Sequence, residues 1–210
     1  MPECLIPSPC ESADPQIPRT EAGRRELSHP HGIRVMAAIT FAAVLLAATT
    51  AVAKDPPGKL ELMTTAFHVG GAIPTQFTCS GDNKSPFLSW TQPPSGTKSF
   101  VLIVDDPDAP GGTWVHWVVY NLPAAARQLS EHVPAGQMIA GGGEQGSNDF
   151  PMNGYGGPCP PPGKRHHYYF RLYALDTTIP LPAAVHRQEV DLAMKGHILA
   201  QAELMGTFGR

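Results

Sequence analysis

The chain has 210 residues and a net charge of −3 at pH 7, with 15 Lys+Arg against 18 Asp+Glu. This near balance, without a clustered basic segment, argues against a nucleic-acid-binding surface, so no nucleic-acid partner is expected. The 23 Pro and 21 Gly favour a chain with many turns and short elements.

An uncharged apolar run, AAITFAAVLLAATTAVA, occupies residues 37–53. Arg34 precedes it, and Ala51 and Ala53 form an A-x-A pattern at its end, which is typical of a secretory signal cleaved after Ala53. A membrane anchor is the alternative, but the run is shorter than the ~20 strongly apolar residues of a spanning helix. We therefore expect residues 1–53 to be an N-terminal extension plus signal peptide. Residues 54–210 would then form one exported domain, periplasmic or secreted.

Short segments rich in Val, Ile, Phe and Tyr recur along the predicted domain. They predict strands over residues 60–67, 87–90, 100–106, 114–121 and 167–176. One helix is predicted over residues 192–204, where Leu192, Leu199 and Ala202 recur at helical spacing and would pack on a sheet. Many strands, frequent turns and one late helix indicate a mainly β fold, an antiparallel β-sandwich with a C-terminal helix.

Two cysteines, Cys79 and Cys159, follow the predicted cleavage site. In an oxidising compartment they would form one disulfide bridge, and two buried free thiols are the alternative. Cys159 lies in a Gly/Pro-rich stretch at residues 141–164, which is long for a simple connector. Such loops commonly carry function.

Three predicted strands each place an ionisable side chain on an apolar face, because side chains of equal parity share a face. The expected groups are Asp106 with Phe100, Leu102 and Val104; His116 with Trp114, Val118 and Tyr120; and His166 and Tyr168 with Phe170, Leu172 and Ala174. Buried ionisable groups are costly unless they are paired. We therefore expect Asp106, His116 and His166 to meet in one shallow pocket at the sandwich edge, with Asp105 on the opposite face. The alternative is that nearby backbone satisfies each of them separately.

Four blocks of the sequence resemble the phosphatidylethanolamine-binding protein (PEBP) family, in its bacterial Raf-kinase-inhibitor-like branch. They are DDPDAPGGTWVHW, GYGGPCPPPGKRHHYYFRLYALD, FTCSGDNKSPFLSW and the ending MKGHILAQAELMGTFGR. The resemblance implies a PEBP-like two-sheet fold with a small pocket for phosphate-like anions and phospholipid head groups. The implied lining is Asp106, Asp108, His116, Gly156, Gly157, His166 and Tyr168. One departure is His167, where the family usually has Arg.

The implied pocket would bind an anion through inward-pointing donors. Each histidine can offer an N–H, Tyr168 offers a hydroxyl, and the backbone at Gly156 and Gly157 lets main-chain N–H groups approach a phosphate. Asp106 would fix a histidine tautomer or meet an ammonium group. We expect a binding protein without cofactor or metal, rather than an enzyme, whose ligand is a phosphate-containing small molecule or a phospholipid head group.

This hypothesis has three alternatives. A metal-dependent hydrolase would use Asp106, Asp108, His116 and His166, but no H-x-x-x-H or C-x-x-C spacing is present. A serine hydrolase lacks a G-x-S-x-G elbow, and Ser147 is better explained as a turn residue. A vestigial pocket would leave a protein that acts by contact with a partner protein, as a Raf-kinase-inhibitor-like regulator. The resemblance also makes a homodimer plausible.

Overall fold

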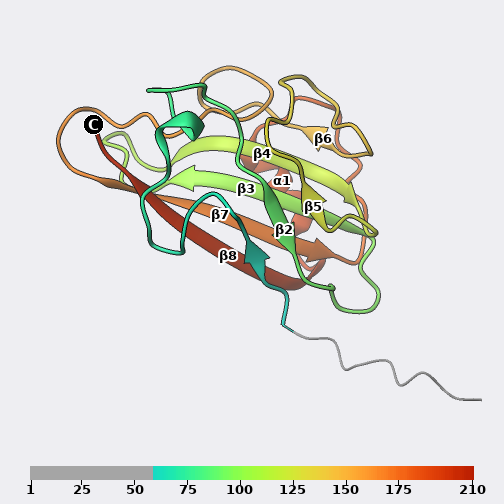
Figure 1. The fold of residues 1–210 in the computed structure, drawn as a ribbon. Coiled ribbons are helices and arrows are strands. Elements are labelled where there is room, and N and C mark those ends of the chain that lie inside the picture. Colours follow the sequence, from blue (N-terminus) through green and yellow to red (C-terminus); the bar gives the residue numbers. More distant parts are fainter. Residues whose placement is uncertain (1–58) are drawn as a thin grey trace, which may run out of the picture. The chain divides into compact units, whose positions relative to one another are not determined.

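The computed structural model describes residues 59–210, so the predicted signal peptide and its cleavage site lie outside the described residues. Two antiparallel sheets make up most of this part (Figure 1). The smaller has the order β1-β2-β5, with β1 at Leu62–Met63, β2 at Leu88–Trp90 and β5 at Gln128–Leu129. The larger has the order β6-β4-β3-β7-β8, with β6 at Glu144–Gln145, β4 at Trp114–Pro123, β3 at Ser99–Asp106, β7 at His166–Leu175 and β8 at Ile198–Phe208.

Apolar side chains cover both faces of the five-stranded sheet. On one face Phe100, Trp117 and Phe170 belong to a buried cluster that also contains Leu62 and Leu88 of the smaller sheet. This cluster joins the two sheets, because alternate residues of each strand point into the space between them.

The other face of the large sheet is covered by the only α-helix among residues 59–210, α1 at Arg187–Met194. Val190 and Met194 of α1 pack with Val101, Ile103 and Val118 of the sheet. A single 3₁₀ turn, η1 at Thr75–Phe77, lies between β1 and β2. No helix within the described range is long and apolar enough to cross a membrane.

The mainly β fold with antiparallel sheets and one C-terminal helix is confirmed, but the predicted bounds of that helix are wrong. The chain leaves the helix after Met194, where Gly196 takes a positive φ of 81° and the N–H of His197 bonds to the carbonyl of Met194. Residues 198–208 then form β8 and pair with β7.

The predicted packing of the helix through Leu192, Leu199 and Ala202 is also wrong. Leu192 and Leu199 are 63% and 40% exposed. Ala202 packs on the core together with Ala200 and Leu204, so the apolar positions recur with the period of two that a strand requires.

Candidate functional site

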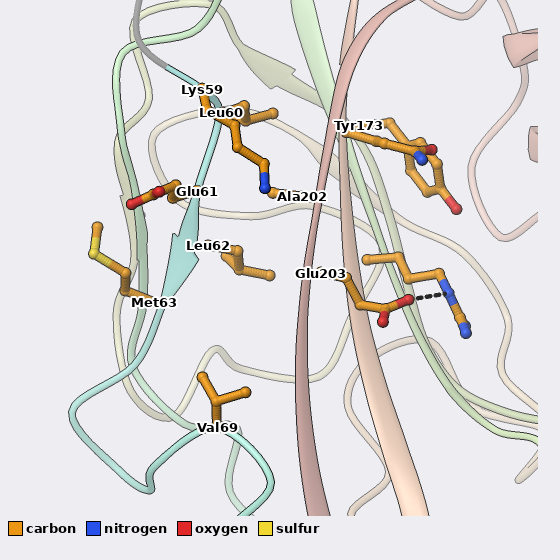
Figure 2. Close-up of a pocket in the computed structure, with 11 residues that line it drawn as sticks. Lys59, Leu60, Glu61, Leu62, Met63, Val69, Tyr173, Ala202 and Glu203 are labelled. Carbon is orange, nitrogen blue, oxygen red and sulfur yellow. Dashed lines mark hydrogen bonds and ion pairs between the residues drawn. The ribbon is translucent and has the colours of Figure 1, made fainter.

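Two hollows are prominent on the described part of the chain. The larger, with a volume of about 630 Å³, is a groove between β1 and the β7–β8 edge of the large sheet, lined by residues that include Leu62, Val69, Tyr173 and Glu203 (Figure 2). Two of its charged groups pair with each other: Glu203 accepts a hydrogen bond from Nε of Arg171 at 3.1 Å, drawn as the dashed line in Figure 2. Arg171 also pairs with the buried Asp105. Within residues 59–210 the groove contains no histidine, and Asp106, His116 and His166 do not line it.

The smaller hollow, of about 170 Å³, lies where the loops join the ends of β3, β4 and β7. We call it the histidine pocket. Its lining brings together Asp106, His116 and His166 with an apolar wall of Ala109, Pro110, Trp114, Phe150, Cys159, Pro160 and Pro161. The three ionisable residues predicted to meet thus do so, from three adjacent strands of one sheet.

Asp106 and His166 form a buried pair on one side of the pocket. Nδ1 of His166 lies 2.7 Å from Oδ2 of Asp106, and the two side chains are 7% and 4% exposed. The other carboxylate oxygen accepts the N–H of Asp108 at 2.8 Å, which fixes the turn after β3. A carboxylate only accepts, so Nδ1 of His166 carries the proton, and Nε2 is the nitrogen that remains for a ligand.

His116 reaches the same pocket because of a β-bulge. Along the β3–β4 ladder, Val104 pairs with Trp117 and Asp105 with Val115, so His116 is an extra residue on β4. The parity argument, which placed His116 beside Val118 and Tyr120, is therefore wrong for those two neighbours. They belong to the cluster under α1, whereas His116 packs edge-on against Phe150 and Tyr168. Bulges commonly redirect side chains next to functional sites.

The ring of His116 is held by a backbone carbonyl. Its Nδ1 lies 2.6 Å from the oxygen of Gly156 and donates to it, so Nε2 again remains for a ligand. Burial lowers the pKa of His116 below its usual 6.5, although Gly156 and the charge of Asp106 oppose the shift. In its neutral form His116 therefore offers the ligand a hydrogen-bond acceptor, whereas the sequence suggested a donor.

Tyr168, predicted to be a ligand residue, is not among the residues that line the pocket: its ring packs edge-on against His116, and its buried hydroxyl lacks a hydrogen-bond partner among residues 59–210. Burial, and secondarily the negative charge of Asp106, raises the pKa of this hydroxyl above its usual value, so it stays protonated. Leaving a buried hydroxyl without a partner costs about 1–3 kcal/mol of folding stability.

The remaining predicted ligand residues have partners within the protein. Asp108 accepts bonds from the backbone N–H and Nδ1 of His167, at 2.8 and 2.7 Å, so the residue that replaces the expected Arg pairs with a rim carboxylate. These bonds lower the pKa of Asp108. The N–H of Gly156 donates to the carbonyl of His116, and that of Gly157 donates to Asn83. Neither glycine N–H is free for an anion, in contrast to the expectation from the sequence.

The glycines serve instead to let two segments approach closely. A Cβ on Gly156 would lie 2.4 Å from the ring of Phe150, and one on Gly157 would lie 2.4 Å from the carbonyl oxygen of Phe77. Neither glycine lines the pocket, and their role is structural: they bring the loop against β4 and against the turn after η1.

Sequence reasoning missed the aromatic wall of the pocket. Trp114 and Phe150 contact edge to face, with ring centroids 5.5 Å apart, and Trp114 stays 38% exposed. Phe150 is held in place by Asn148, whose side chain accepts the N–H of Phe150 and donates to the carbonyls of His116 and Gly154. Trp114 shares the strand parity of His116, so the sequence could have identified it as a pocket residue. Phe150 and Asn148 lie in an irregular loop, for which no periodicity exists.

The predicted Cys79–Cys159 disulfide is present and forms part of the pocket wall, because Cys159 is one of its lining residues. The N–H of Cys79 also donates to the carbonyl of Pro158 at 3.1 Å. No group of three or more His, Cys, Asp and Glu side chains within residues 59–210 is arranged to hold a metal ion.

Comparisons with known proteins agree with the motif blocks. The profile of the family described as phosphatidylethanolamine-binding protein matches residues 63–209. A UPF0098 protein from Methanothermobacter thermautotrophicus is 47% identical over 151 residues, which cover 72% of this chain and 99% of that protein. A UPF0098 protein from Aquifex aeolicus is 47% identical over 153 residues, which cover 72% of this chain and 89% of that protein.

Solved structures of PEBP homologues have the same fold. A PEBP homologue from Chlamydia trachomatis shares 41% identity with a TM-score of 0.66, over 72% of this chain and 98% of that one. E. coli YbcL, described as a member of the mammalian PEBP family, shares 35% identity with a TM-score of 0.67, over 73% of this chain and 99% of that one. The chain thus belongs to the phosphatidylethanolamine-binding protein family, in its bacterial branch.

Proposed function

We propose that this protein is an exported, non-enzymatic binding protein whose histidine pocket holds the phosphate group of a small molecule or of a phospholipid head group. The observation that carries the proposal is the pair of rings fixed at Nδ1, His116 by Gly156 and His166 by Asp106. Both keep Nε2 for a ligand in one cavity of about 170 Å³. Rings fixed in advance lose little entropy when a ligand binds.

The size and wall of the pocket also support a head group. A volume of about 170 Å³ is below the ~300–1,000 Å³ of pockets for drug-sized ligands, so only a small group fits. The polar end is formed by Asp106 and the histidines, and Trp114 and Phe150 offer an apolar flank at the mouth. A phosphate attached to a short organic chain, as in phosphoethanolamine, matches both parts.

Binding without turnover is proposed because the lining of the pocket offers no side-chain nucleophile. Among residues 59–210, the lining of the pocket contains no Ser, Thr or Lys. The sulfur of Cys159 is bonded to Cys79 in a disulfide. Export is proposed from the signal-like sequence at residues 37–53 and agrees with the disulfide, since such bonds persist in oxidising compartments.

Calorimetric titration with phosphoethanolamine tests the proposal. We expect saturable 1:1 binding to the wild type and at least a tenfold loss in affinity for His116→Ala, because one of two ligand-facing nitrogens is removed. His68→Ala, which changes an exposed histidine outside the pocket, is the matched control and should bind as the wild type does. Equal affinity of all three proteins, or no binding to any, would refute a phosphate site in this pocket.

A further inference from the structure

The groove of Figure 2 runs along the outer edge of β8. β8 is the last strand of the five-stranded sheet, so β7 pairs with one of its edges and the other faces outward. Toward its C-terminal end this outer edge is covered. The carbonyl of Met205 accepts the N–H of Gly70, and Thr207 bonds to Gly71 and Ile73, all at 2.8 Å. Met205 and Thr207 therefore turn their backbone groups away from β7.

The outer edge is open a few residues earlier, along the groove. Because backbone direction alternates along an antiparallel strand, Gln201 and Glu203 turn their N–H and C=O groups the same way as Met205 does. Within residues 59–210 these groups have no hydrogen-bond partner, and both residues line the groove. A row of unpaired strand donors and acceptors is a template for pairing with another chain.

The opposite wall of the groove is a second free strand edge. β1 is the outer strand of the small sheet. Just before it, Glu61 turns its backbone toward Thr91: its carbonyl accepts the N–H of Thr91 at 3.1 Å, and its own N–H donates to Oγ1 at 2.9 Å. Leu60 and Leu62 therefore turn their backbone groups the other way, on the side of the groove that they line. Figure 2 shows β1 on one side of the groove and β8 on the other.

The side chains beside these edges set the kind of strand that fits. On the inner side of β8 the small Ala202 packs on the cluster that contains Leu60 and Leu62, so an apolar side chain has room there. Val69, 75% exposed, extends this apolar surface at one end of the groove (Figure 2). Glu203 points to the opposite face of the sheet, where its partner Arg171 lies. A strand with alternating apolar and polar side chains matches both faces.

The polar face of the edge carries a surplus negative charge. Asp105, Asp191 and Glu203 share two guanidiniums, those of Arg171 and Arg187, so three carboxylates meet two positive charges. Glu203 is the most exposed of the three carboxylates, at 51%, and the only one of them that lines the groove. Cross-strand neighbours share a face of a sheet, so a cation on an added strand would lie beside Glu203 and offset this charge.

We propose that the groove binds an extended peptide segment of a partner protein, which adds as a strand to the free edge of β8 at residues 201–203. Apolar side chains of the segment face Leu60 and Leu62, and a Lys or Arg on its other face lies beside Glu203. Main-chain hydrogen bonds supply the affinity, and the alternating side chains select the partner. The groove shares no lining residue with the histidine pocket, so the two sites bind independently.

Acetylated and amidated hexapeptides test the inference on the whole protein by calorimetry. The probe alternates valine and lysine, a second peptide has glutamate in place of lysine, and a third is the lysine peptide with a methyl group on every backbone nitrogen. We expect the lysine peptide to bind at least about tenfold more tightly than the glutamate peptide. The methylated peptide should not bind, because it cannot donate to the edge of β8.

Amide hydrogen exchange locates the contact. The N–H groups of Gln201 and Glu203 should exchange more slowly with the lysine peptide bound. The N–H of Thr207, which already donates to the carbonyl of Gly71, should not change. Bound peptide that leaves the exchange of both Gln201 and Glu203 unaltered would overturn the inference.

Three variants complete the test. Gln201→Pro removes an outward N–H but keeps the bonds to β7, so affinity for the lysine peptide should fall at least about tenfold. Glu203→Lys should reverse the preference, so that the glutamate peptide binds more tightly. Glu189→Lys makes the same charge change at an exposed site of α1 outside the groove and should keep the wild-type preference. If a groove variant does not fold, the exchange of the two wild-type amides decides.

The remaining outcomes overturn the inference. Absence of binding, or equal affinity for the lysine peptide and either control peptide, would show that the edge does not accept a strand of this kind. A second copy of the chain on the edge would appear in sedimentation as a dimer that Gln201→Pro converts to a monomer. A monomer whose Gln201 and Glu203 amides exchange slowly without peptide would show that residues outside the described range occupy the edge.

Discussion

At the scale of single residues, the two histidines of the pocket differ in the group that fixes each ring. His166 is held by the carboxylate of Asp106, whereas His116 is held by the uncharged carbonyl of Gly156. Burial therefore lowers the pKa of His116 below its usual 6.5. The folded state thus binds the His116 proton less tightly than the unfolded state does.

This difference predicts a loss of stability in acid. Because the folded pKa of His116 is depressed, its contribution is complete above pH 6.5 and is lost as the pH falls through the folded pKa. The free energy of unfolding should fall by up to about 1.4 kcal/mol per pH unit below 6.5 from this residue. His116→Gln should flatten that part of the profile in urea unfolding at pH 4.5–7.5. His68→Gln, at an exposed site, should not, and identical profiles for all three proteins would contradict the account.

The unpaired hydroxyl of Tyr168 predicts opposite effects on stability and binding. Tyr168→Phe removes a buried group without a hydrogen-bond partner, so the free energy of unfolding should stay the same or rise by about 1 kcal/mol, while phosphoethanolamine binds more weakly. Tyr155→Phe is the contrast: its hydroxyl donates to the carbonyl of Phe77 at 2.8 Å, and its loss should destabilise by about 1 kcal/mol. A destabilised Tyr168→Phe with unchanged affinity would show that this hydroxyl is paired and has no role in the site.

What the sequence predicts at this scale depends on how regular each strand is. Asp106 and His166 lie on strands that pair in register near the pocket, so alternation placed them correctly. His116 is the extra residue of a bulge, and alternation gave it the wrong neighbours. The pairing of the Gly157 N–H with Asn83, 74 residues away, depends on tertiary structure and leaves no local pattern.

At the scale of elements, one buried carboxylate links β3, β7 and α1 behind the pocket. Asp105, 1% exposed, pairs with Arg171 of β7 and with Arg187 of α1, the latter at 2.6 Å. Asp105 is adjacent to Asp106 but points to the opposite face, as the parity argument predicted. Each of the two carboxylates therefore holds a partner from β7, one on each side of the sheet.

Removal of this carboxylate should be costly. Asp105→Ala leaves two partly buried arginines without their shared buried acceptor and only the more exposed Glu203 and Asp191 as partners, so we expect a loss of about 3 kcal/mol in the free energy of unfolding. The matched control is Asp176→Ala, which breaks an exposed pair with His197 and should cost less than about 1 kcal/mol. Chemical denaturation measures both, and similar small losses would contradict a structural role for Asp105.

The longest element that the sequence failed to predict is β8. Its apolar residues at Ala200, Ala202 and Leu204 follow a period of two, yet Leu192, Leu199 and Ala202 also fit a helical repeat. Short apolar runs are ambiguous between the two periods. The tertiary contacts decide: β7 offers a free edge, and Gly196 ends the helix before the run begins.

At the scale of the whole described domain, the pocket is closed by two segments far apart in the sequence. The loop that carries Gly157 and Cys159 docks on the turn after η1 through the Cys79–Cys159 bond and through Asn83, which accepts the N–H of Gly157 at 2.8 Å. The bridge spans 80 residues and encloses β2 to β6. Pocket and overall stability are therefore coupled.

Loss of the bridge should lower the stability of the whole domain. The chain-entropy model gives about 4–5 kcal/mol for a loop of this length. Thermal unfolding of the paired variant Cys79→Ser/Cys159→Ser should show a markedly lower Tm, with phosphoethanolamine affinity reduced because the wall loosens. Reduced wild type should behave in the same way. An unchanged Tm in both would show that hydrogen bonds alone hold the segments together.

The central claim is that a phosphate-bearing ligand binds at Nε2 of His116 and His166, and side-chain ¹H–¹⁵N NMR of the histidines tests it most directly. On titration with phosphoethanolamine, the Nε2 signals of these two residues should shift, while those of the exposed His68 and His197 stay in place. Nδ1 of both pocket rings should keep its proton, because Gly156 and Asp106 accept it. Saturated ligand that moves neither Nε2 signal, or that perturbs Tyr173 and Ala202 in the groove of Figure 2 instead, would contradict it.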